Sequence, residues 1–133
     1  MLTIRREQIL AMLTGHPCLI TAIHRKVQAE YAAIVEGLPQ DIIREMIGNG
    51  LQAARHLGLS RPADLAGFVL IMFEVGPEFH RHPQVRAVLE NTEIQAEQKL
   101  AEMFARTDER VWEEIILVLH RQTWFPELRS LES

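Results

Sequence analysis

The fold is decided by the stretch Pro62-Ala63-Asp64-Leu65-Ala66-Gly67-Phe68-Val69-Leu70-Ile71-Met72-Phe73-Glu74-Val75. Its apolar side chains would point to nearly every side of a helix, and a helix that is apolar all round has to be buried on several sides. Ser60 can cap this helix, and Pro62 suits its first turn. Gly76-Pro77 ends it. We therefore predict a central helix over about residues 61–75, with the other elements packed around it.

On both sides of this stretch, apolar residues recur at three- and four-residue steps, which predicts further amphipathic helices. These cover about residues 4–13, 17–35, 39–57, 83–89, 92–106 and 107–120. The apolar face of the last one is Val111, Trp112, Ile115, Ile116, Val118 and Leu119. No stretch alternates for long enough to indicate a strand. We predict an all-α fold, a compact bundle of five to seven helices forming one domain over residues 1–133, with the tail frayed beyond about residue 126.

Composition narrows the class of protein. The net charge is -4, with 47% hydrophobic and 24% charged residues, which is a globular balance and not that of a disordered chain. Nucleic-acid binders usually carry a concentrated basic face, and the helix over 61–75 is too apolar to read base edges. We therefore predict no nucleic-acid partner.

The apolar runs and the single cysteine indicate where the protein works. The longest apolar run, Phe68 to Phe73, is too short to span a bilayer, so we predict no membrane segment. Residues 1–8 lack the features of a secretory signal peptide. One cysteine, Cys18, cannot form an internal disulfide, which suits a reducing compartment. The cytoplasm is the expected location.

Two histidines close together, His80 and His82, are the candidate metal ligands, with Glu74 and Glu78 nearby. Zinc accepts imidazole nitrogen and carboxylate oxygen. The spacing differs from the helical His-Glu-x-x-His pattern, in which both rings share one face. Ordinary loop histidines are the alternative, and we expect no cofactor.

Acidic residues are concentrated in residues 90–114, where eight acids stand against Lys99, Arg106 and Arg110. Such a run is either a solvated helical face or a docking surface, for a basic partner or for the basic N-terminus of a second copy. A partner would be expected to contact Glu97, Glu102 and Glu109, which lie within this stretch.

Two further features have two interpretations each. Trp124-Phe125 follows the last predicted helix, and these aromatics either fold back over the core or anchor a partner. Gly48-Asn49-Gly50 interrupts the predicted helix 39–57, at a cost of roughly 1 kcal/mol per glycine. The glycines mark either a kink or a close contact between helices.

The order of several motifs resembles a family of small helical proteins. The motifs are Ile4-Arg5-Arg6-Glu7-Gln8, Ile47-Gly48-Asn49-Gly50-Leu51-Gln52-Ala53-Ala54-Arg55-His56-Leu57-Gly58-Leu59, Asp64-Leu65 and Leu70-Ile71-Met72-Phe73-Glu74-Val75-Gly76-Pro77-Glu78-Phe79. The family is encoded beside type VI secretion spike proteins, effector adaptors and toxin modules of Gram-negative bacteria. The resemblance covers about residues 4–95. It departs after Phe79, where His80-Arg81-His82 replaces acidic residues.

The resemblance implies a non-catalytic accessory role, as an adaptor, chaperone or immunity protein that binds a secreted effector, a toxin or a spike component. Two other functions stay open. One is a metal-dependent enzyme or effector centred on His80 and His82. The other is a self-associating homodimer, formed through an apolar helix face or through Trp124-Phe125.

Overall fold

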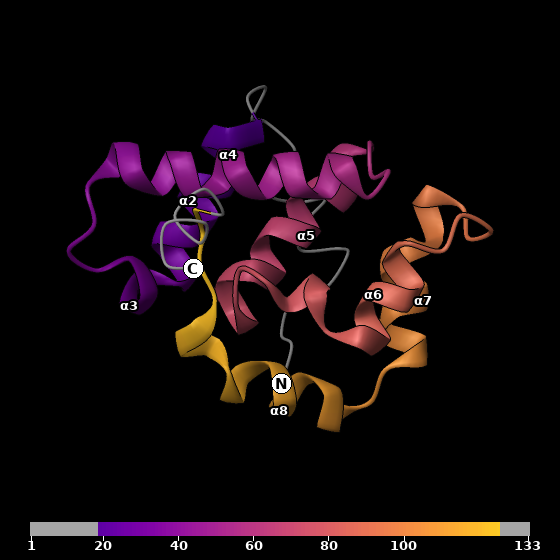
Figure 1. Cartoon of the computed structure of the whole chain (residues 1–133). Helices are drawn as coiled ribbons and strands as arrows, with labels where there is room; N and C mark the ends of the chain where they lie inside the picture. Colours follow the sequence, from indigo (N-terminus) through magenta and orange to yellow (C-terminus); the bar gives the residue numbers. More distant parts are fainter. Residues whose placement is uncertain (1–18, 126–133) are drawn as a thin grey trace.

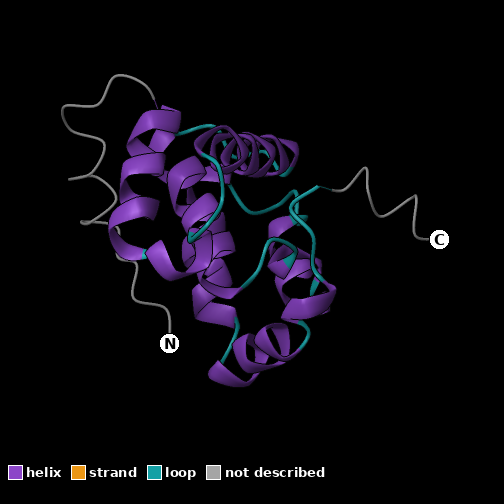
Figure 2. Ribbon diagram, turned by 90° about the vertical axis from the view of Figure 1, so that its left-hand side faces the viewer, coloured by secondary structure: helices purple, strands orange, loops and turns teal. Residues whose placement is uncertain are grey.

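The computed structural model describes residues 19–125, and in this range the chain is all-α. The helix predicted over residues 4–13, Cys18 and the tail from residue 126 lie outside the described residues. Seven α-helices and three short 3-10 helices are joined by loops, with no strand between residues 19 and 125 (Figure 2). The predicted fold class is confirmed.

The elements follow one another with short connections. The α-helices are α2 (Leu19–Glu30), α3 (Ala32–Val35), α4 (Gln40–His56), α5 (Pro62–Val75), α6 (Pro83–Leu89), α7 (Lys99–Arg106) and α8 (Glu109–Leu117). The 3-10 helices are η1 (Phe79–Arg81), η2 (Ala96–Gln98) and η3 (Leu119–Arg121). Within residues 19–125 no helix has the length and apolar character needed to cross a membrane.

Helix α5 lies at the centre of the molecule, as its apolar sequence predicts. Every residue from 64 to 73 is buried. Helices α2, α4 and α8 all pack against it, and Figure 1 shows α4 above it and α8 below. Helices α6 and α7 pack against each other at one side of this core (Figure 1).

Three predicted boundaries differ from the structure. In the segment predicted as one helix over 17–35, the described residues 19–35 form two helices that meet at Tyr31. The segment 92–106 is helical only from Ala96. The last helix stops at Leu117 and gives way to η3. The break at Tyr31 coincides with a tertiary contact. The centroid of the Tyr31 ring lies 6.5 Å from that of Phe73 on α5. A contact between residues so far apart in the chain cannot be predicted from the local sequence pattern.

The two glycines of α4 have different surroundings. The helix runs unbroken through both. A Cβ atom added at Gly50 would lie 2.9 Å from the sulfur of Met72 and 3.1 Å from a methyl of Val69, both on α5. A Cβ at Gly48 would meet nothing within 4 Å. Gly50 therefore permits the close approach of α4 to α5, which is one of the two predicted interpretations.

A polar corner fixes α7 to the connection between α4 and α5. Lys99 is only 8% exposed, and its Nζ donates to the carbonyl of Leu57 at 2.6 Å. A cation at this position satisfies a free carbonyl at the C-terminal end of α4 and complements the helix dipole. Arg61 pairs with Asp64 at 2.9 Å and donates to the carbonyl of Glu97 at 3.0 Å.

The two glycines make a matched pair for mutation. Gly48→Ala should raise the free energy of unfolding by about 0.5–1 kcal/mol, because alanine favours the helix and the site is open. Gly50→Ala should instead lower it by about 1 kcal/mol, because the added methyl would crowd Met72 and Val69 on α5. Urea denaturation measures both, and equal stability of the two variants would contradict the proposed role of Gly50.

Candidate functional site

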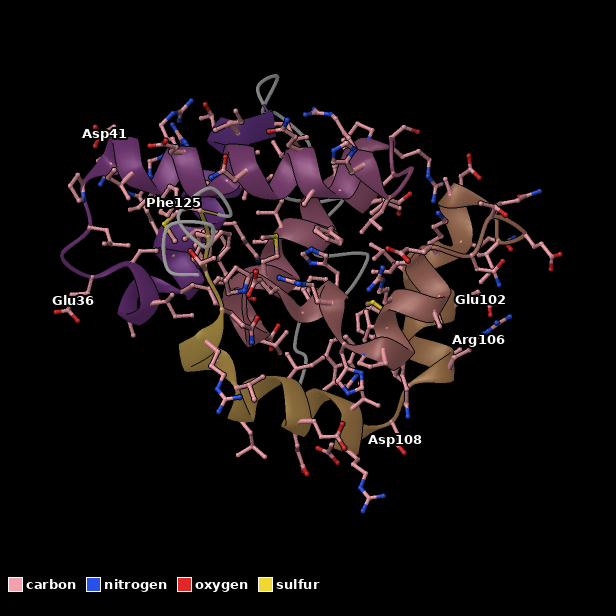
Figure 3. The ribbon with its side chains drawn as sticks, in the orientation of Figure 1. Glu36, Asp41, Glu102, Arg106, Asp108 and Phe125 are labelled. Atoms are coloured by element: carbon pink, nitrogen blue, oxygen red, sulfur yellow. The ribbon has the colours of Figure 1, made fainter. Side chains whose placement is uncertain are left out.

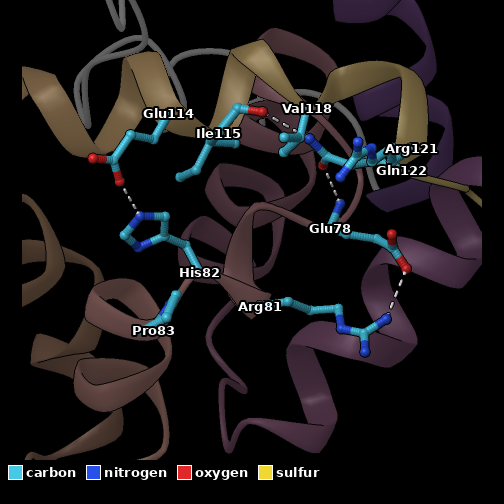
Figure 4. A pocket seen from close by; sticks show the side chains of 9 residues that line it. All are labelled: Glu78, Arg81, His82, Pro83, Glu114, Ile115, Val118, Arg121 and Gln122. Atoms are coloured by element: carbon cyan, nitrogen blue, oxygen red, sulfur yellow. Dashed lines mark hydrogen bonds and ion pairs between the residues drawn. The ribbon is translucent and has the colours of Figure 1, made fainter.

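One cleft of about 320 Å³ lies between η1 and the C-terminal end of α8 (Figure 4). Its lining residues are Glu78, Arg81, His82, Pro83, Glu114, Ile115, Val118, Arg121 and Gln122. The loop that carries the predicted metal ligands therefore meets α8 and η3 here.

Ionic groups in the cleft are paired with one another. Nη1 of Arg81 lies 3.3 Å from a carboxylate oxygen of Glu78. The ring of His82 accepts from the backbone N–H of Gln84 through Nδ1, at 3.2 Å, and so caps α6. The proton is thereby assigned to Nε2, which donates to Glu114 at 2.8 Å. His82 is thus engaged in holding α6 and α8 together.

Gln122 joins three segments at the inner end of the cleft. Its Oε1 accepts from the backbone N–H of Glu78 at 2.7 Å, and its Nε2 donates to the carbonyl of Ile115 at 3.0 Å (Figure 4). The side chain lies over Gly76, where φ is 133° and where an added Cβ would collide with Gln122. Gln122 therefore fixes η3 against the turn that follows α5.

His80 has a different environment from His82. Its ring contacts those of Phe68 and Phe79, at centroid distances of 5.4 and 5.6 Å. Its Nδ1 is buried without a hydrogen-bond partner. Burial is the main cause that lowers the pKa of His80. The carboxylate of Glu78 acts to raise this pKa, and the positive charge of Arg81 lowers it further. His80 is therefore a half-buried ring that packs on the aromatic part of the core.

The structure does not bring His80 and His82 together as a metal site. One ring packs on aromatic side chains, and the other bonds to Glu114 and to the start of α6. Among residues 19–125, no group of three or more His, Cys, Asp and Glu side chains is placed to hold a metal ion. Each ring therefore has its own structural contacts in the fold.

The predicted acidic contacts come from three different elements. Glu97 lies in η2, Glu102 in α7 and Glu109 in the first turn of α8. Glu102 pairs with Arg106 at 2.8 Å, on the same helix (Figure 3). The stretch 90–114 therefore does not form one continuous helical face, and of these three predicted contact residues only Glu109 lies on α8.

Trp124 and Phe125 fold back toward the core. The Trp124 ring lies 4.4 Å from that of Phe73, and its carbonyl accepts from Asn49 at 2.9 Å. Phe125 is half-buried and packs against the same core (Figure 3). This is the first of the two interpretations given for these aromatics.

Sequence reasoning missed an apolar patch at the end of α8. Four consecutive side chains are exposed: Ile116 at 39%, Leu117 at 76%, Val118 at 40% and Leu119 at 45%. We call these four residues the α8 patch. Helix α8 packs inward through Val111, Trp112 and Ile115 instead. The inward placement predicted for Ile116, Val118 and Leu119 was wrong. Ile116 is one helical step round from the inward Ile115, and α8 ends at Leu117, so Val118 and Leu119 do not continue its inner face.

The outer face of α8 carries acids in addition to the patch. Glu109, Glu113 and Leu117 are spaced by four residues, so they lie on one side of the helix, and all three are exposed. Exposed Arg110 lies beside them. The outer face is therefore mainly acidic at its start and apolar at its end.

Comparisons with known proteins identify no relative. The chain matches no family model, no curated protein and no solved structure. Its function has to be argued from the surface described above.

Gln122 and Gln28 provide a matched test of the contact at the cleft. Gln122→Ala should lower the free energy of unfolding by about 1–3 kcal/mol, because it leaves partly buried backbone groups of Glu78 and Ile115 unpaired. Gln28→Ala removes one exposed hydrogen bond to Gln40, so it should change stability by less than about 0.5 kcal/mol. Urea denaturation gives both values. An equal effect would contradict the role of Gln122.

His80 should make the protein sensitive to acid. Its native pKa lies below the value of about 6.5 in the unfolded chain. The stability that the neutral ring supports is fully present above about pH 6.5 and is lost as the pH falls through the lowered native pKa. His80→Leu should therefore lose less stability than the wild type between about pH 7 and pH 5.

Urea denaturation at both pH values measures this difference, and His56→Gln, at the exposed end of α4, is the control. His24, whose pKa is lowered by burial and by Arg44, would account for part of the remaining slope. Identical pH slopes for wild type and His80→Leu would contradict the assignment.

Proposed function

We propose that this chain is a non-catalytic protein-binding module and that the outer face of α8 is its docking surface. The observation that carries the proposal is the α8 patch, in which Leu117 is 76% exposed. Contiguous exposed apolar residues in a folded domain commonly mark an interaction site.

Physical properties of the patch suit an interface. Burying apolar surface gains about 25 cal/mol per Å², so covering four large aliphatic side chains favours association. Charged residues adjoin the patch, as the polar rim of an interface adjoins its apolar centre. The cleft suits a ligand less well, because Arg81 and His82 already have partners within it.

The resemblance over residues 4–95 supplies the setting of the proposal. The chain would act in the bacterial cytoplasm as an adaptor, chaperone or immunity protein of a secretion or toxin system. Its partner would be a secreted effector, a toxin or a spike component. Absent catalytic motifs in the sequence agree with a binding role.

Co-expression with the product of each neighbouring gene, followed by size-exclusion chromatography with light scattering, tests the proposal. One product should form a stable complex. Leu117→Asp should weaken that complex by at least about tenfold, since it places a charge in the buried centre of the interface. Leu38→Asp changes an exposed leucine outside α8 and should leave affinity unchanged. A complex equally tolerant of both changes would exclude the outer face of α8.

A further inference from the structure

Charge on the outer face of α8 limits what can cover it. The exposed acids Glu109 and Glu113 stand beside one cation of this face of the helix, Arg110, and exposed Arg121 follows the patch on η3. Glu114 lies off this face, in the cleft, where it contacts His82. A partner therefore meets an apolar end of the helix and a net negative start, about 12 Å apart over the eight residue steps from Glu109 to Leu117.

We propose that the occupant of this face is a basic amphipathic helix of another protein. Its aliphatic side chains would contact Ile116 and Leu117, and its lysine or arginine side chains, one or two turns away, would face Glu113 and Glu109. The inference rests on the proposed function and names the partner's chemistry. Helices that dock in this way place apolar anchors at three- and four-residue steps.

The size of the surface favours a helix over a large folded face. Stable interfaces between globular partners bury about 800 Å² on each side. The α8 patch has four side chains, three of them less than half exposed. An area of this extent matches the apolar stripe of a short amphipathic helix, which buries one narrow face.

Charge also separates this occupant from others. A second copy docked through its own α8 face would present the same acids, and opposed like charges weaken association. An anionic membrane surface attracts basic segments and would be repelled by Glu109 and Glu113. A basic helix is the occupant whose charge complements the surface.

Three labelled helical peptides test the inference by fluorescence anisotropy with the full chain. The first has leucines at three- and four-residue steps and lysines at the other positions. The second replaces every lysine by glutamate, and the third scrambles the first. The first peptide should bind at least about tenfold more tightly than either of the others. Its affinity should fall as salt rises, because exposed charges are screened.

Paired variants locate the binding. Glu113→Lys and Leu117→Asp should each weaken binding of the basic peptide by at least about tenfold. Glu45→Lys and Leu38→Asp change an exposed acid and an exposed leucine outside α8, so they should leave it unchanged. Circular dichroism of each variant shows whether it is folded.

Each other result overturns the inference. Equal binding of the acidic or scrambled peptide, insensitivity to Glu113→Lys and Leu117→Asp, or no peptide binding would exclude a basic helix as the occupant. A homodimer abolished by Leu117→Asp would identify a second copy instead. If the peptides fail while a neighbouring gene product still binds through Leu117, the proposed function stands and only the partner's chemistry is wrong.

Discussion

Helix α5 is apolar on every side, and the arrangement of the other helices follows from the burial that it requires. Residues 64–73 are buried without exception, so several elements must pack against one helix. Gly50 lets α4 approach closely, with Met72 and Val69 filling the space that a side chain would take. Helix α8 covers another side through Val111, Trp112 and Ile115. Only this side of α8 contacts the core. The apolar residues after Ile115 therefore stay outside the core and form the exposed patch.

Local pattern was enough to predict α5, because its composition alone requires burial. The sequence also allowed two interpretations of Gly48-Asn49-Gly50, and the close contact between helices is the one found at Gly50. The Lys99 corner could not be predicted, because a lysine that caps the end of a helix 42 residues earlier in the chain leaves no local signal. The α8 patch was missed for a related reason. Periodicity identifies apolar residues, but whether another element reaches them is a tertiary property.

The histidine loop shows the limit of motif reasoning about sites. His80 and His82 are two residues apart, yet one ring packs on Phe68 and the other bonds to Glu114. His80 therefore packs on the core, and His82 links α6 to α8 at the cleft. The outer face of α8 differs from this loop, since Leu117 contributes little to packing while it is 76% exposed. A surface that the core does not use is the better candidate for recognition.

Thiol labelling at position 117 shows whether the outer face of α8 is open in the free protein and covered in a complex. In a Cys18→Ser background, Leu117→Cys gives a single thiol on the outer face of α8, and Met103→Cys gives a buried control. We expect the thiol at position 117 to react in the free protein at nearly the rate of an unfolded chain, and to be protected when the partner binds. Protection in the free, monomeric protein would exclude this face as a docking surface, because the chain itself would already cover it.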